Sequence, residues 1–148
     1  MQNFSEGPHA PTIRDEGFIY SATGKGRVGF IDAEDIAATA AATLTTTPPL
    51  NADVVLTGPE ALSYADVAVI ISEVAGRPVR HVVLEPATLA ARLVAQGLPT
   101  DYAHTLAGMD ANIAAGAEDC TTSAVEQLTG QRPTSFRDFA KRAFEQRK

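Results

Sequence analysis

The first candidate for cofactor chemistry is a glycine-rich run at residues 24–29, which matches the pattern G-x-G-x-x-G. This pattern binds the pyrophosphate of a dinucleotide when a strand precedes it and a helix begins at its third glycine, because the helix N-terminus then points backbone N–H groups at the phosphates. Here the third glycine is followed by residues 30–32, which favour a strand, and a helix is expected only afterwards. We therefore interpret the run as the turn of a β-hairpin that joins strands at 18–20 and 28–31.

No tyrosine has the neighbour it would need for proton transfer. Many dehydrogenases lower the pKa of a tyrosine with a lysine four residues later on the same helical face. At that spacing the three tyrosines are followed by glycine, alanine and leucine: Tyr20 by Gly24, Tyr64 by Ala68 and Tyr102 by Leu106. Tyr64 and Tyr102 fall on apolar helical faces, which predicts core residues whose hydroxyls reach water.

The other reactive residue types are also scattered. His9, His81 and His104 are far apart and show no metal-ligand spacing, so no metal site is predicted. Cys120 follows Asp119 and has no nearby cation to stabilise a thiolate. The sequence contains no G-x-S-x-G motif for a serine nucleophile.

Three acidic residues cluster where a helix is expected to begin, at about residue 33. Carboxylates such as Asp32, Glu34 and Asp35 are favoured there by the helix dipole and by capping, so we interpret them as capping residues. One stripe along this helix, which is expected to end near residue 46, predicts close packing against a sheet: Ile36, Ala37, Ala40, Ala41 and Leu44.

The rest of the chain predicts few short strands followed by helices. Residues 54–56 form a continuous apolar run, which is typical of a strand buried on both faces of a parallel sheet. A helix capped by Ser63 and Asp66 leads to a strand at 79–84. Further helices are expected at 86–97, 99–116 and 123–129 and from 135 onward, the last with Phe136, Phe139 and Phe144 on one face. The expected class is therefore α/β with a helical C-terminal part.

Composition excludes several classes of partner. The 148 residues carry a net charge of −6 and a pI near 4.9, which argues against nucleic acid and acidic membranes. No apolar run approaches the roughly 20 residues that span a bilayer. Cys120 is the only cysteine, and residues 1–6 lack the basic and apolar regions of a signal peptide. We therefore expect a cytoplasmic protein.

Five segments, taken in order, resemble the C-terminal half of the NmrA-like proteins, a group of atypical short-chain dehydrogenases. Residues 1–4 resemble the end of their Phe-x-x-Asn segment, 30–37 their "fIDveDIA" junction, and 56–64 their "LTGPealSy" turn. Residues 76–79 and 129–136 complete the set. The resemblance includes both quinone-reductase-like and festuclavine-dehydrogenase-like members.

The resemblance implies the C-terminal part of a Rossmann-like NAD(P)-binding fold, with few short strands. Residues 1–85 would end the Rossmann-like domain, and residues 86–148 would form a helical substrate lobe. The implied activity is NAD(P)-dependent hydride transfer to a quinone, an imine or a similar small acceptor. Asn3 and Phe4 would belong to the nicotinamide and substrate pocket, and Asp32 would hold its wall together.

The resemblance also implies a further half that carries the family's own glycine motif and most of the parallel sheet. NAD(P) is therefore not expected to bind this chain alone, and the chain is expected to pair with that half or with itself. Two alternatives stay open: a redox-sensing regulator without turnover, and a stand-alone binding or oligomerisation module. A proton donor in the pocket would separate an enzyme from a regulator, and the sequence offers no convincing one. The mass of the purified chain in size-exclusion chromatography would test the oligomerisation module.

Overall fold

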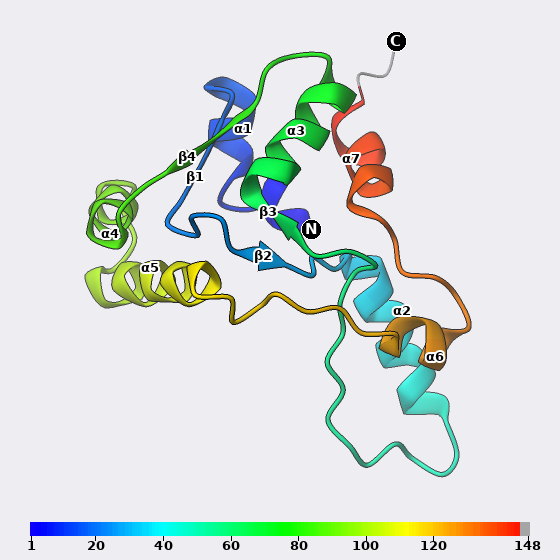
Figure 1. Ribbon diagram of the computed structural model, residues 1–148. Coiled ribbons are helices and arrows are strands. Elements are labelled where there is room, and N and C mark those ends of the chain that lie inside the picture. Colours follow the sequence, from blue (N-terminus) through cyan, green and yellow to red (C-terminus); the bar gives the residue numbers. More distant parts are fainter. Residues whose placement is uncertain (146–148) are drawn as a thin grey trace.

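The computed structural model describes residues 1–145 and consists of short strands and helices. In chain order the elements are η1 (Gln2–Phe4), α1 (Ala10–Asp15), β1 (Phe18–Ser21), β2 (Arg27–Val28), α2 (Ala33–Thr45), β3 (Leu62–Ser63), α3 (Tyr64–Ala75), β4 (Arg80–Val83), α4 (Pro86–Ala95), α5 (Thr100–Ala114), α6 (Ala124–Thr129) and α7 (Phe136–Phe144). Helices α4 and α5 lie on one side and α2 and α6 on the other (Figure 1). The expected α/β class, with few short strands and many helices, is confirmed.

The strands form two separate pairs. β1 runs parallel to β4, with Phe18 opposite Arg80, while β2 runs antiparallel to β3. The β-hairpin that we predicted across residues 24–29 is therefore wrong, because β1 and β2 belong to different sheets. The chain between them instead packs against the C-terminal end of α5: the backbone of Ile113 leaves no room for a side chain at Gly26.

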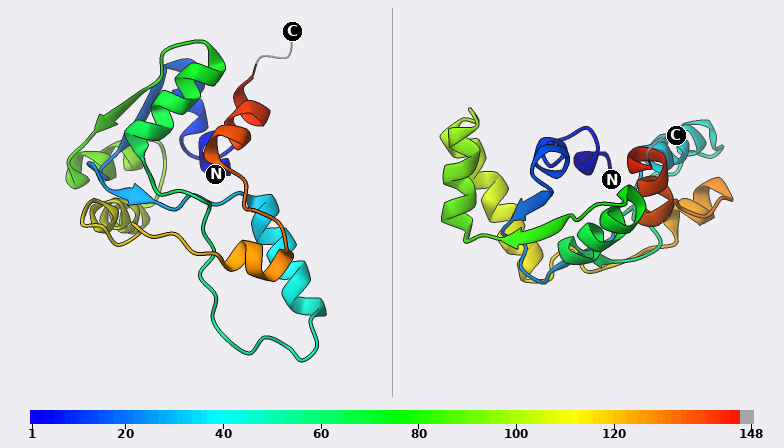
Figure 2. Two further views of the ribbon diagram at one scale, coloured as in Figure 1. Left: turned by 45° about the vertical axis from the view of Figure 1, so that its right-hand side comes forward. Right: turned by 90° about the horizontal axis from the view of Figure 1, so that it is seen from above.

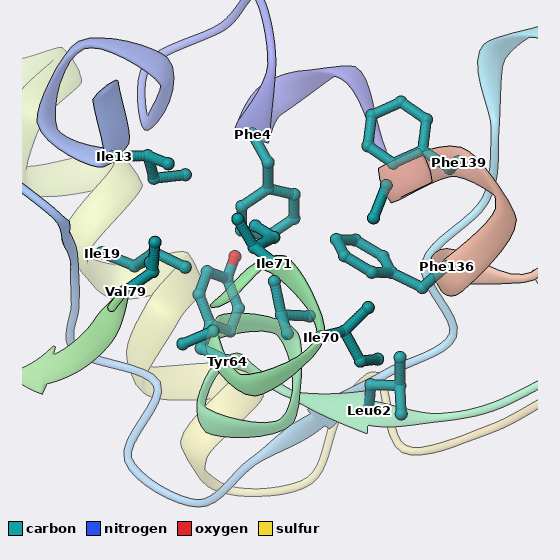
Figure 3. Packing of buried hydrophobic residues seen from close by; sticks show 13 residues of the cluster. Phe4, Ile13, Ile19, Leu62, Tyr64, Ile70, Ile71, Val79, Phe136 and Phe139 are labelled. Carbon is teal, nitrogen blue, oxygen red and sulfur yellow. The ribbon is translucent and has the colours of Figure 1, made fainter. Parts of the chain in front are cut away.

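The core lies around α3, which begins and ends as the sequence indicates. Ser63 and Asp66 form a reciprocal capping box, and Gly76 ends the helix with a φ of 64°. Aromatic rings from η1, α3 and α7 meet in this core (Figure 3). Its buried members are Phe4, Ile13, Ile19, Leu62, Tyr64, Val67, Ala68, Ile70, Ile71, Val79, Phe136, Phe139 and Ala140.

Helices α4 and α5 pack against each other at one end of the molecule, whereas α7 returns to α3 (Figure 2). Small residues mediate the α4–α5 contact, since Ala90, Ala103 and Ala107 are all buried. Tyr102, predicted as a core residue, is 55% exposed. That prediction is wrong because the alanine face of α5, not its tyrosine, turns toward α4. A boundary near residue 85 remains a prediction.

At the other end, α2 and the segment after it carry exposed apolar residues. The stripe that we predicted to pack on a sheet faces solvent in this chain, and Leu44 at its end is 86% exposed. The predicted buried strand at 54–56 is also wrong: the segment is not a strand, and Val55 is 63% exposed. It pairs with no strand among residues 1–145. Instead, Thr122 holds it by donating a hydrogen bond to the carbonyl of Val55 at 2.7 Å.

Candidate functional site

A cavity of about 700 Å³ opens between the N-terminal segment, the residues around β2, the start of α3, and helices α4 and α5. Its wall is largely apolar and includes Val28, Phe30, Leu89, Leu93, Leu106 and Ile113. A concave, mostly apolar cavity of this size, with a few polar groups on its wall, is typical of a small-molecule site.

His9 is a polar group on this wall. Its ring stacks on Phe4 at a centroid distance of 5.2 Å and lies 5.7 Å from the ring of Tyr64. Burial and, to a smaller extent, the nearby charge of His81 together lower the pKa of His9 to about 4. The imidazole is therefore neutral at neutral pH, so it can accept or donate one hydrogen bond without placing a charge in the cavity.

Tyr64 and Asp110 are two further polar groups of the cavity. Burial raises the pKa of Tyr64, and the carboxyl of Asp110 raises it further, so the phenol stays protonated and can donate a hydrogen bond. Burial also raises the pKa of Asp110, an effect partly offset by the N–H of Ala22, which donates to its Oδ2 at 2.8 Å. The expectation that Tyr64 is a core residue is confirmed, and Figure 3 shows it among the packed side chains of the core.

The structure places the three predicted site residues differently. Asn3 is exposed and lines the cavity. Phe4 is 1% exposed and lies in the core, with its ring 5.6 Å from that of Tyr64 and 5.4 Å from that of Phe136. Phe4 therefore supports the cavity from behind, through its stacking on His9, and does not form its surface.

Asp32, the third of these residues, is fully buried at the start of α2. Its carboxylate caps the helix by accepting the N–H of Glu34 at 3.0 Å, and it also accepts the side-chain amide of Gln2 at 2.9 Å and pairs with Arg142. Burial alone would raise the pKa of Asp32, but these hydrogen bonds and the guanidinium charge outweigh it and lower the pKa. For Asp32 the capping interpretation is confirmed, and the same carboxylate fixes Gln2, the residue next to Asn3. Asp35 instead accepts the N–H of Thr134 at 2.7 Å, and Glu34 pairs with Arg142.

The glycine-rich run does not fit a dinucleotide pyrophosphate. A side chain at Gly26 would overlap the carbonyl oxygen of Ile113, and one at Gly29 would lie 2.5 Å from that of Cys120. These glycines permit close packing against protein backbone, not an approach to phosphate. Because α2 begins only at Ala33, no helix N-terminus follows the run directly.

Other chemistries find little support in the part of the chain that the structure describes. Residues 1–145 contain no group of three or more histidine, cysteine or acidic side chains that could hold a metal ion. Among the same residues, no helix combines the length and the apolar character needed to cross a membrane. Cys120 is exposed and unpaired with another cysteine.

Sequence reasoning missed two polar groups of the cavity. His9 was considered only as a metal ligand, and Asp110 was not considered. One signal was available for Asp110, because it lies between Met109 and Ile113 on a helix predicted to present an apolar face. For His9 no signal existed, since only the fold brings it beside Tyr64.

Known proteins match the chain closely over part of their length. It is 47% identical over 140 residues to the uncharacterised oxidoreductase YesF of Bacillus subtilis, and this match covers 95% of the chain and 49% of YesF. It is 45% identical over 141 residues to an agroclavine dehydrogenase of Claviceps fusiformis, covering 94% of the chain and 49% of that enzyme. The chain thus spans about half the length of the curated relatives it matches.

The fold is shared with a solved structure as well. An NADPH-dependent quinone oxidoreductase of Escherichia coli superposes with a TM-score of 0.83 and 25% identity, over 92% of this chain and 50% of that one. No family model matches the chain. These relatives confirm the resemblance stated from the sequence: over more than nine-tenths of its length, the chain corresponds to one half of the NmrA-like NAD(P)-dependent oxidoreductases, the family to which it belongs.

Proposed function

We propose that this chain forms the acceptor-binding side of an NAD(P)-dependent oxidoreductase, which reduces a quinone, an imine or a similar flat acceptor. One observation carries the proposal: a single cavity combines an apolar wall with Asn3, His9, Tyr64 and Asp110. The relatives support the reaction class, since they are oxidoreductases and a solved one is NADPH-dependent.

The chain's own residues would bind and orient the acceptor. The ring of Phe30 and the leucines of α4 and α5 offer apolar contact and exclude water. The protonated hydroxyl of Tyr64 can donate a hydrogen bond to an acceptor oxygen or nitrogen. Asn3 stands on the same wall with donor and acceptor groups of its own, and its position is fixed through Gln2 and Asp32.

The dinucleotide would depend on a second half, because the glycine run of this chain does not fit a pyrophosphate. The apolar stripe on α2 and the exposed residues of 50–55 offer a surface for that half. The same surface favours the second candidate function, a self-associating module, in which another copy of the chain would cover the stripe. The mass in solution distinguishes pairing with a second half from self-association.

The cytoplasmic location also remains a proposal, based on the single cysteine.

The acceptor cavity can be tested by narrowing its entrance. Met109 lines the cavity but is largely exposed, so tryptophan at this position should fill the mouth without disturbing the core. We expect Met109→Trp to weaken the binding of menadione, a flat quinone, at least about tenfold, or about 1.4 kcal/mol. Binding is measured by calorimetry on the purified chain.

The matched control is Val69→Trp, which adds the same indole to an exposed position of α3 outside the cavity. It should leave the affinity for menadione unchanged. Equal affinity of Met109→Trp and the native chain would contradict the proposed site, as would a native chain that binds neither menadione nor a flat amine of similar size.

A further inference from the structure

Asp110 has a free carboxylate oxygen in a cavity whose wall is largely apolar. Its Oδ2 accepts the N–H of Ala22 at 2.8 Å, which ties α5 to the loop after β1. Among residues 1–145, no hydrogen bond reaches its Oδ1 and no salt bridge involves Asp110. The backbone contact therefore explains one carboxylate oxygen and leaves the other available to a ligand.

An arginine side chain also lines the cavity, but it already interacts with other residues. Arg92 lines the same cavity, but its guanidinium lies 3.8 Å from the centroid of the Tyr20 ring and 3.5 Å from the carboxylate of Glu16. His9 faces the cavity as a neutral ring. Glu118, at the exposed rim, adds a second negative charge. The charged groups of the cavity thus leave Asp110 without a counter-ion.

We propose that Asp110 makes the cavity selective for flat ligands that carry a protonated nitrogen, whose N–H donates to the free Oδ1. The rings of Phe30 and Tyr64 line the same space and offer aromatic faces on which such a cation is also stabilised. The selectivity rests on the proposed acceptor cavity and narrows its ligands from quinones toward nitrogen bases. A carboxylate is a poor neighbour for a quinone carbonyl, because both groups only accept hydrogen bonds.

The test compares three probes of one shape and different charge: 1-naphthylmethylamine, which is protonated at neutral pH, 1-naphthalenemethanol, which is neutral, and 1-naphthoate, which is an anion. Calorimetric titration of the purified chain should rank the amine at least about tenfold tighter than the alcohol, since a charge-assisted hydrogen bond to the half-buried carboxylate of Asp110 exceeds a neutral one by this order. The anion should bind weakest.

Asp110→Asn is the decisive variant, because the amide oxygen can still accept the N–H of Ala22 while the charge is gone. The preference for the amine over the alcohol should fall to less than about twofold, with alcohol binding retained. Glu118→Gln removes an acidic charge at the rim and should preserve the preference.

An unchanged preference in Asp110→Asn would overturn the inference, as would a native chain that binds the three probes equally. Menadione binding distinguishes a failure of the proposed role of Asp110 from a failure of the proposed acceptor cavity. If the native chain binds menadione but shows no amine preference, only the role of Asp110 fails; if it binds neither menadione nor the probes, the acceptor cavity fails with it.

Discussion

Replacing Phe136 by alanine is expected to remove about 3–5 kcal/mol of the free energy of unfolding, the usual effect of truncating a buried phenylalanine. The ring of Phe136 is fully buried, and its centroid lies 5.4 Å from that of Phe4, 5.8 Å from that of Phe30 and 5.6 Å from that of Phe139. The truncation would open a cavity where η1, α3 and α7 meet. Such a loss approaches the whole stability of a typical domain.

Urea unfolding of the purified variant provides the measurement, and soluble expression provides a coarse readout if the variant does not fold. Phe144→Ala is the matched control, because Phe144 lies at the end of the same helix and is only partly buried. It should cost less than half as much. Equal losses for the two variants, or a loss of under about 1 kcal/mol for Phe136→Ala, would contradict the described core.

A methyl group at Gly26 is expected to produce the second large effect. The Cβ of Gly26→Ala would overlap the carbonyl oxygen of Ile113 and crowd the Cα of Ala114, which are backbone atoms of α5. Backbone cannot rotate away as a side chain can, so the loop and the helix must separate. We expect a loss of about 1–3 kcal/mol, the range for overpacked sites, and weaker menadione binding, because α5 forms one wall of the cavity.

Gly108→Ala in α5 provides a control that should change the stability in the opposite direction. Gly108 lies within α5, and no atom lies within 4 Å of the place its Cβ would take. Alanine should therefore stabilise the chain by about 0.5–1 kcal/mol, through its better helix propensity. If Gly26→Ala melted at the same temperature as the native chain, the close contact between the loop and α5 would be wrong.

The sequence predicted those elements whose signals are local. Helix caps at Asp32 and Ser63 depend on residues a few positions apart, and the structure confirms them. The aromatic face of α7 follows from helical spacing alone, and its first two phenylalanines are buried. Such features need no knowledge of the rest of the fold.

Pairing between strands was not predictable in the same way. The glycine-rich run suggested a hairpin because β1 and β2 are near in sequence, but β1 pairs with β4, about sixty residues away. The prediction that the apolar stripe of α2 is buried was wrong for a different reason. Hydrophobic spacing shows which face of α2 can be buried, but whether anything covers that face depends on chain that lies elsewhere, and within residues 1–145 it is exposed.

The candidate site was predicted only in part. The resemblance led to Asn3, which lines the cavity, and to Phe4, which lies behind it. His9, Tyr64 and Asp110 come from three segments that are distant in sequence, so no spacing rule could group them. Their chemistry also depends on burial, which sets the pKa of His9 and Asp110 and exists only in the folded chain.

The most direct measurement of the central claim is the affinity for NADPH of the isolated chain, compared with the same chain joined to the half of YesF that it does not match. In the proposed arrangement the acceptor cavity lies in this chain and the pyrophosphate site lies in the other half. Calorimetry should therefore give a Kd weaker than about 1 mM for the isolated chain, or about −4 kcal/mol, and a micromolar Kd for the joined protein, near −8 kcal/mol. Micromolar binding by the isolated chain, or none by a folded joined protein, would contradict it.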